Sequence, residues 1–163
     1  MMMAPVLRRA TPADAESGAR CHAECWREAY AAIVDPDVLR RSTDDLEGRI
    51  ARWREQLSRH TDERWVALQS GQVVGFSSAG PGRDDDLPGL EMYACYVRSR
   101  FWGSGLGSCL VRAAIGDAPA YLWVFEANAR ARAFYRKHGF VEDGTNKDEP
   151  RFGRPEVRMV RDG

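Results

Sequence analysis

The feature that most constrains this chain is a glycine-rich turn between an apolar segment and a helix-like segment. The apolar residues 90–97 are followed by Gly103, Gly105 and Gly107, and residues 105–115 then have helical character. Glycines at alternate positions remove side chains from a short arc of backbone, so its N–H groups can converge on an anion. The following helix adds unpaired first-turn N–H groups and the positive end of its dipole. The segment therefore predicts a strand–turn–helix unit that binds a phosphate or a pyrophosphate.

Length and charge limit the classes of partner. A chain of 163 residues suits a single domain, residues 1–163. Its 24 basic and 24 acidic residues balance and are interspersed, which argues against nucleic acid or an anionic membrane as a partner. No apolar run approaches the roughly 20 residues of a membrane span, and the first residues do not resemble a secretory signal. We expect a cytoplasmic protein without a metal site, in which the cysteines are reduced thiols. These are Cys21, Cys25, Cys95 and Cys109.

The rest of the chain has the pattern of a mixed α/β domain. Helical periodicity is found over residues 11–30, 43–57, 105–115 and 128–138. Strand-like segments are found over residues 6–10, 64–68, 73–79, 90–97, 120–125 and 156–160. The dipeptide Asp35-Pro36 is interpreted as a break after the first helix, and residues 81–89 and 143–155 are interpreted as polar loops.

Two common nucleotide-binding motifs fit the glycines less well. A dinucleotide-binding fingerprint would have its third glycine at position 108, which is Ser108, although Glu126 stands near the place of that motif's acidic residue. A P-loop needs a lysine directly after the glycines, and none is near.

The turn instead resembles the acetyl-CoA motif of the GNAT superfamily of N-acetyltransferases, Gln/Arg-x-x-Gly-x-Gly/Ala. Residues 100–105 carry it here, although Trp102 stands where many members have Arg or Gln. A second segment, residues 122–140, is similar to the same family's strand, Asn-x-x-Ala, Phe-Tyr and Gly-Phe sequence. Residues 8–30 are also similar, so the likeness covers nearly the whole chain.

The resemblance implies an α/β fold and acetyl-CoA as the cofactor. The sheet would be mixed, with about six to seven strands splayed between the fourth and the fifth, flanked by about four helices. The backbone of residues 95–97 would pair with the pantetheine arm, amides of residues 103–108 would hold the pyrophosphate, and Asn128 would contact the pantetheine or keep the strands splayed. The implied cofactor-binding residues are Cys95, Tyr96, Val97, Arg100, Gly103, Ser104, Gly105, Leu106, Gly107, Ser108, Asn128 and Tyr135.

The implied reaction is attack of a neutral primary amine on a thioester carbonyl. Because an alkyl amine is almost fully protonated at neutral pH, a carboxylate is expected to take its proton. Glu91 is the first candidate for this general base and Glu126 the second. Tyr135 matches the family's general acid, and it is expected to act chiefly as a hydrogen-bond donor because a phenol is a weaker acid than a thiol.

The predicted acceptor residues combine aromatic rings with an acid, which suits a small cationic amine. They are Trp26, Tyr30, Tyr93, Trp123 and Glu126. A small-molecule amine is the leading acceptor. A lysine side chain or N-terminal amine of a protein is the second, and a non-catalytic acyl-CoA-binding module is a third interpretation. A homodimer is possible, because similar proteins commonly form one. The acidic run 84–86 is interpreted as a solvated loop.

Overall fold

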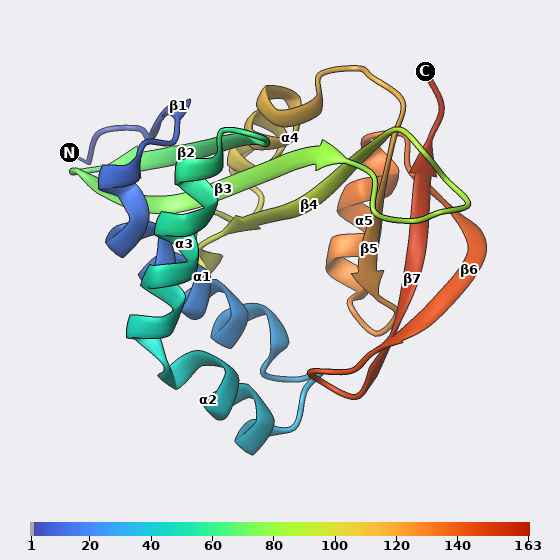
Figure 1. Cartoon of the computed structure of the whole chain (residues 1–163), viewed down its shortest axis with the longest axis horizontal. Coiled ribbons are helices and arrows are strands. Elements are labelled where there is room, and N and C mark those ends of the chain that lie inside the picture. Colours follow the sequence, from blue (N-terminus) through green and yellow to red (C-terminus); the bar gives the residue numbers. More distant parts are fainter. Residues whose placement is uncertain (1) are drawn as a thin grey trace.

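One mixed sheet of seven strands forms the centre of the molecule (Figure 1). The computed structural model describes residues 2–163. The strands lie in the order β1-β2-β3-β4-β5-β7-β6. Their bounds are β1 Val6–Arg9, β2 Glu63–Gln69, β3 Gln72–Pro81, β4 Leu90–Val97, β5 Ala120–Phe125, β6 Val141–Glu149 and β7 Arg154–Arg161. All neighbouring strands are antiparallel except β4 and β5, which are parallel.

The sheet divides into two halves where β4 meets β5. These strands are paired at Glu91 and Tyr121, near the beginning of each, and diverge beyond that pair. On its other edge β4 stays paired with β3 as far as Gly75 opposite Val97. One edge of β4 is therefore left open towards its carboxyl end, which confirms the predicted splay between the fourth and fifth strands (Figure 1).

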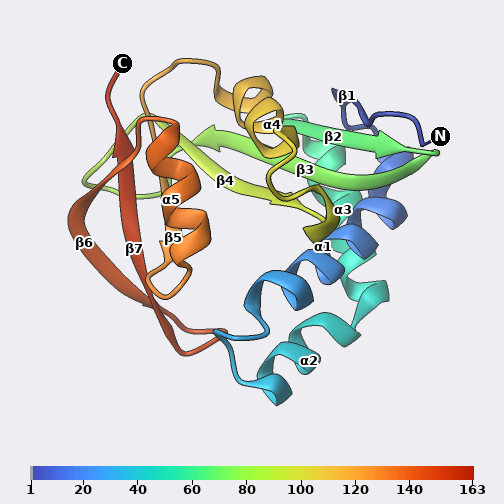
Figure 2. The ribbon, with the colours of Figure 1, turned by 180° about the vertical axis from the view of Figure 1, so that it is seen from behind.

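Five α-helices cover the two halves, one more than expected. They are α1 Ala15–Tyr30, α2 Pro36–Asp44, α3 Leu46–Arg59, α4 Leu106–Ile115 and α5 Ala129–Lys137. Alternating residues of β3 point to opposite faces: Val73 packs into the core under α1 and α3, while Val74 packs against Leu110 of α4. Helix α5 covers β5 and β7 in the other half (Figure 2). No helix in residues 2–163 has the length and apolar character needed to cross a membrane.

Two elements differ from the sequence-based predictions. Asp35-Pro36, interpreted as a break, begins α2, because the Asp35 carboxylate accepts hydrogen bonds from the N–H groups of Asp37 and Val38 and Pro36 occupies the first helical position. Residues 143–149, predicted to be a loop, continue β6 because they pair with β7, from Asn146 opposite Val157 to Glu149 opposite Arg154. Polar residues are tolerated there because β6 is an edge strand.

Candidate active site

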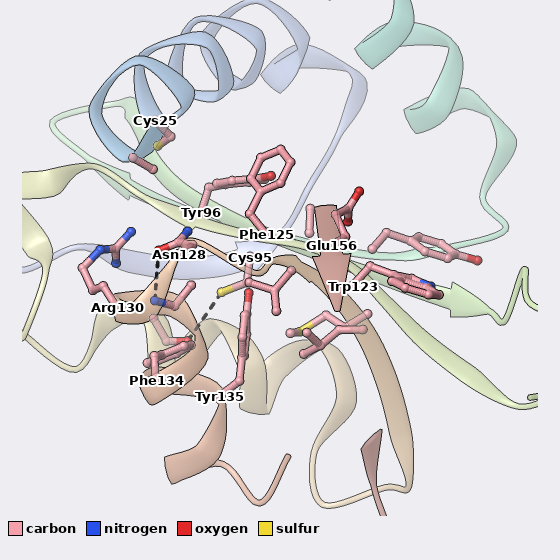
Figure 3. A pocket seen from close by; sticks show the side chains of 18 of the residues that line it. Cys25, Cys95, Tyr96, Trp123, Phe125, Asn128, Arg130, Phe134, Tyr135 and Glu156 are labelled. Atoms are coloured by element: carbon pink, nitrogen blue, oxygen red, sulfur yellow. Dashed lines mark hydrogen bonds between the residues drawn. The ribbon is translucent and has the colours of Figure 1, made fainter. Parts of the chain in front are cut away.

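A cavity of about 1020 Å³ lies where the two halves of the sheet diverge. It is lined by β4 and β5, by residues of the turn between β4 and α4, by the ends of α1 and α5, and by the β6–β7 hairpin. The volume is at the upper end of the range usual for small-molecule sites. Figure 3 shows side chains from these elements converging on the cavity.

The glycine-rich turn forms one wall of the cavity with exposed backbone. Gly103 and Gly105 have φ angles of +78° and +90°, which side-chain-bearing residues rarely adopt. A Cβ atom added at either glycine would meet nothing within 4 Å, so the space above the turn is open. The N–H groups of Gly107 and Ser108 precede the first intrahelical bond of α4, in which Cys109 N–H donates to the Gly105 carbonyl at 3.1 Å. These groups are therefore available to an anion at the helix N-terminus.

We call the residues predicted to bind the pyrophosphate, 103–108, the cradle. Some of their N–H groups already donate hydrogen bonds within the turn itself. The Ser104 N–H donates to the Phe101 carbonyl at 3.1 Å, and the Leu106 N–H donates to the Ser104 hydroxyl at 3.3 Å. Neither residue lines the cavity, and neither does Arg100, whose guanidinium lies over the Phe101 ring. The amides of Gly103, Gly107 and Ser108 and the turn at Gly105 are the part of the predicted set that faces the cavity.

Trp102, the residue that departs from the motif, stacks against the side chain of Arg130, which was not among the predicted site residues. Its indole N–H donates to the Val97 carbonyl at 3.2 Å, and the Arg130 guanidinium lies 3.6 Å from the centre of its ring. Arg130 lines the cavity, and burial lowers the pKa of its side chain. The stacked pair brings a positive charge to the side of the cavity next to the glycine turn.

Tyr135 projects from α5 into the middle of the cavity (Figure 3). The Phe134 and Phe140 rings pack edge-on against its ring, which is 9% exposed. Burial raises the pKa of Tyr135 well above its ordinary value, so the phenol keeps its proton at neutral pH. Cys95, a neighbour on β4, has its pKa raised to about 12 by burial and is likewise a neutral thiol.

The other predicted residues of β4 and α5 also reach the cavity. The backbone and side chains of Cys95, Tyr96 and Val97 line it along the open edge of β4. Asn128 lines it as well, and its side-chain oxygen accepts a hydrogen bond from the Ala131 N–H at 3.2 Å, which caps α5. The structure therefore brings most of the predicted cofactor residues to one continuous surface.

The position of Glu91 argues against the predicted general base. Its carboxylate is 1% exposed and accepts hydrogen bonds from the Arg83 guanidinium at 2.7 and 3.0 Å, from the Arg83 N–H at 3.0 Å and from the Tyr121 hydroxyl at 3.1 Å. These four hydrogen bonds tie the carboxylate to Arg83 and Tyr121, so it is not free to contact a ligand amine. Glu126, the second candidate, is exposed and is not part of the cavity lining, which also corrects its assignment as an acceptor residue.

Several acidic side chains that line the cavity were not predicted, namely Asp84, Asp148, Glu149 and Glu156, and Glu156 is one of them that forms no ion pair within 4 Å among residues 2–163. It lies on β7, opposite Phe125 of β5 and Lys147 of β6. It is half-buried, and burial raises the pKa of its carboxyl group. The alternation of residues 156–160 indicated a strand, but no sequence signal indicated that this strand adjoins β5.

Two hydrogen-bonded phenols form part of the cavity wall. The Tyr30 and Tyr96 hydroxyls are 2.7 Å apart. Burial raises the pKa of Tyr30 well above its ordinary value and also raises that of Tyr96, so both phenols are neutral at neutral pH.

The four aromatic residues predicted for the acceptor all line the cavity. They are Trp26, Tyr30, Tyr93 and Trp123. Phe125 and Phe152, which were not predicted, complete the wall: the Phe152 ring packs edge-on against Trp26 at 5.1 Å and against Phe125 at 5.6 Å between ring centres. Trp123 is fixed in place by a hydrogen bond from its indole N–H to Asp84 at 3.0 Å.

The acidic run 84–86 lies in an exposed loop between β3 and β4, as expected, but Asp84 and Asp86 also bind an arginine of the far half of the sheet. The Arg158 side chain on β7, 6% exposed, donates to Asp84 at 2.9 Å and to both carboxylate oxygens of Asp86 at 2.8 and 2.9 Å. It also donates to Asp143 at 2.7 Å. This group, which we call the Arg158 clamp, connects the loop after β3 to the far half of the sheet.

Comparisons with known proteins agree with this arrangement. The profile of the acetyltransferase (GNAT) family matches residues 23–140. The chain is 32% identical over 147 residues to a probable N-acetyltransferase of Mycobacterium tuberculosis, covering 85% of this chain and 80% of that protein. The PaiA N-acetyltransferase of Thermoplasma acidophilum, solved in complex with coenzyme A, has the same fold, with a TM-score of 0.73, 16% identity and coverage of 99% and 100% of the two chains. A ribosomal-protein-alanine N-acetyltransferase of Brucella melitensis superposes with a TM-score of 0.70 at 26% identity, over 97% of this chain and 99% of that one.

Proposed function

Since this chain belongs to the acetyltransferase (GNAT) family, whose cofactor is acetyl-CoA, we propose that it acetylates a primary amine of a small molecule. One observation carries this proposal. A single cavity joins a set of available backbone N–H groups at the N-terminus of α4, the Tyr135 phenol and the Glu156 carboxylate. Anion binding, a proton donor and a proton acceptor are the functions that transfer of an acyl group from a thioester to an amine requires.

The residues of the cavity fit coenzyme A. Above Gly103 and Gly105 there is space that an added Cβ would enter without contact, and the Gly107 and Ser108 N–H groups point out of the first turn of α4. These groups would hold the pyrophosphate. Beyond Glu91, β4 has no strand partner on the side of β5, so the backbone of residues 95–97 could pair there with the amides of the pantetheine arm, apart from the Val97 carbonyl, which accepts the Trp102 indole N–H.

The proposed chemistry divides between two side chains. Acetyl-CoA, when bound, supplies an acetyl group activated as a thioester. Glu156 takes a proton from the amine nitrogen, directly or through a water molecule, because its carboxylate has no ion-pair partner in the cavity and its pKa is raised by burial. Tyr135 donates its hydroxyl proton in a hydrogen bond to the sulfur as negative charge develops there. The C–N bond forms as the C–S bond breaks, the departing thiolate takes a proton from solvent and Glu156 returns its proton to solvent, so the products are the N-acetylated amine and coenzyme A with a free thiol.

A protein N-terminal amine is the second candidate acceptor. The Brucella melitensis structure carries the name of an enzyme that acts on a ribosomal protein, and it covers nearly the whole chain. Against this acceptor, residues 147–152 of the β6–β7 hairpin form part of the cavity wall, and a peptide chain would have to pass them.

The experiment combines a binding and a turnover measurement on the full-length chain. Calorimetry with coenzyme A tests the cradle, and release of thiol from acetyl-CoA over a panel of small amines and short peptides tests the reaction. We expect micromolar binding of coenzyme A and turnover with one or more small amines. Binding without turnover on any acceptor would favour the non-catalytic module, turnover confined to peptides would favour the second candidate, and the absence of both would refute the proposal.

A further inference from the structure

The lysines of this chain have an unusual distribution. Only two of the 24 basic side chains are lysines, Lys137 and Lys147, and both line the cavity. Arginine takes every other basic position, including those in all the ion pairs of the described residues. Lysine differs from arginine in being a compact point charge that is not tied to a planar, bidentate partner. A lysine at the acceptor end of the cavity is therefore a candidate for contact with a ligand.

Lys147 lies on β6 directly opposite Glu156 of β7. Directly opposed residues of an antiparallel pair have Cβ atoms roughly 5 Å apart and point to the same face of the sheet. The two side chains nevertheless form no ion pair within 4 Å. The Lys147 ammonium lies 4.0 Å from the centre of the Trp123 ring, and Glu156 lines the cavity nearby (Figure 3).

The other cations of this end are already engaged. Arg83 is bonded to Glu91, and Arg158 holds its three carboxylates. Arg151 lies over the Trp26 and Phe152 rings, with Glu149 at 3.9 Å. Among the described residues that line the acceptor end, Lys147 is therefore the cation without a carboxylate partner, and Glu156 is a half-buried acid without a cationic partner.

We propose that the acceptor is an amine that also carries a carboxylate one or two carbons away, as in a free amino acid. The amine binds at Glu156, and the carboxylate binds at Lys147 on the Trp123 side. This inference rests on the proposed acetyl transfer and specifies its substrate class. An opposed pair on neighbouring strands places one cation and one acid on the same face of the sheet, so a single small acceptor can contact both. The peptide alternative lacks this carboxylate, because the residue next to a peptide N-terminus continues as an amide.

The test compares matched acceptors on the full-length protein. For several side chains, aromatic ones included, the free amino acid, its amide and the decarboxylated amine are assayed by thiol release from acetyl-CoA. We expect kcat/KM for the free amino acid to exceed that of its two analogues by about tenfold or more. Equal or better use of the amide or the decarboxylated amine would overturn the inference and leave acetyl transfer intact. If no acceptor reacts and coenzyme A does not bind, both proposals fail.

Substitutions of Lys147 separate a ligand contact from a structural role. In Lys147→Gln, KM for the free amino acid should increase about tenfold with kcat little changed, while KM for the amide stays as it was. Lys147→Arg should retain most of the preference for the carboxylate, and Lys147→Glu should reverse it towards acceptors with a second amine. Arg154→Gln, which removes a cation of β7 outside the cavity lining, is the matched control and should leave all three acceptors unaffected.

The affinity of coenzyme A provides a readout independent of turnover. Calorimetry should give the same dissociation constant for the parent chain and for Lys147→Gln. A weaker affinity for coenzyme A, or an equal loss with the free amino acid and its amide, would show that Lys147 serves the cofactor or the fold, and would overturn the assignment.

Discussion

Among single residues, the partners and the burial of each acid and phenol in the cavity indicate which of them can exchange a proton with a ligand. Glu91 and Glu156 both line the cavity, but Glu91 is saturated with donors, whereas Glu156 is half-buried without an ion pair. A group that is desolvated and unpaired has a shifted pKa and can exchange a proton with a ligand. Tyr135 is the phenolic counterpart, kept protonated by burial.

We expect Tyr135→Phe to lower kcat by roughly 10²–10⁴ and to leave the affinity for acetyl-CoA nearly unchanged, because only the donated hydrogen bond is lost. Steady-state kinetics and calorimetry measure the two quantities. Tyr121→Phe is the control: its hydroxyl lies outside the cavity lining and donates to Glu91 at 3.1 Å, so its loss should lower stability by about 1–2 kcal/mol and not kcat. Unchanged turnover in Tyr135→Phe would refute the role of the phenol.

Glu156→Gln should lower kcat/KM by about 10²-fold or more, whereas Glu126→Gln, the same change at an exposed position outside the cavity lining, should have no such effect. Because burial raises the pKa of Glu156, the midpoint of the acid limb of the pH–rate profile should lie above the ordinary pKa range of a glutamate, and this limb should be absent in the variant. A profile unaltered in Glu156→Gln would exclude this base.

The raised pKa of Glu156 also affects stability: the free energy of unfolding should fall as pH rises through the pKa of the folded state. The melting temperature of Glu156→Gln at neutral pH should therefore equal or exceed that of the parent.

For helices and strands, the beginnings of α4 and α2 and the strand β6 show which elements can be predicted from local sequence. The turn before α4 was predicted because its glycines and the helix lie together in the sequence. The start of α2 was missed, although Asp35 and Pro36 are a regular N-cap and first helical residue, because the same dipeptide also terminates helices. Strand β6 was missed because only its pairing with β7 makes its polar residues a strand.

The two ends of α4 allow a matched test of the cradle. Gly105 begins the helix with φ +90° and Gly116 ends it with φ +52°, and neither position has a neighbour within 4 Å of an added Cβ. Gly105→Ala and Gly116→Ala should each cost about 1–2 kcal/mol of stability through backbone strain. Only Gly105→Ala should also weaken binding of coenzyme A, as measured by calorimetry. Equal affinity in the two variants would count against the cradle.

At the scale of the whole molecule, the Arg158 clamp joins the two halves of the sheet across the gap that holds the cavity. Loop residues 84–86 follow β3 in the first half, and Arg158 and Asp143 belong to β7 and β6 in the second. Beyond the pair of Glu91 and Tyr121, the strands themselves do not join the halves on this side. The clamp therefore limits how far the cavity can open.

Arg158→Met should lower the free energy of unfolding, because it leaves three carboxylates without their shared cation. Hydrogen bonds from Arg158 lower the pKa of Asp86, and hydrogen bonds from Thr145 and Arg158 lower that of Asp143 against the opposing effect of burial. A lowered pKa contributes stability above the ordinary carboxyl range near pH 4, and this stability is lost as pH falls through the folded-state values. Denaturant unfolding between about pH 3 and pH 7 should therefore show a smaller loss of stability on acidification in Arg158→Met than in the parent chain. An equally steep loss in both would contradict the clamp.

Sequence motifs were sufficient to predict the family, the mixed sheet with its splay and the strand–turn–helix unit at the glycines, and Tyr135 lines the cavity, while its role as a donor stays a prediction. Each of these depends on residues that are neighbours in the chain, or on motifs in a set order, and the conformations that glycine and helix termini adopt are local properties. The tertiary structure was needed to show that Glu156 lines the cavity without an ion pair and that Asp84 and Asp86 bind Arg158. Strand β7 lies between β5 and β6, out of sequence order, and this placement brings Glu156 and Lys147 into the cavity and Arg158 against the loop. Pairing between strands distant in the chain depends on the packing of both halves together, and no single segment encodes it.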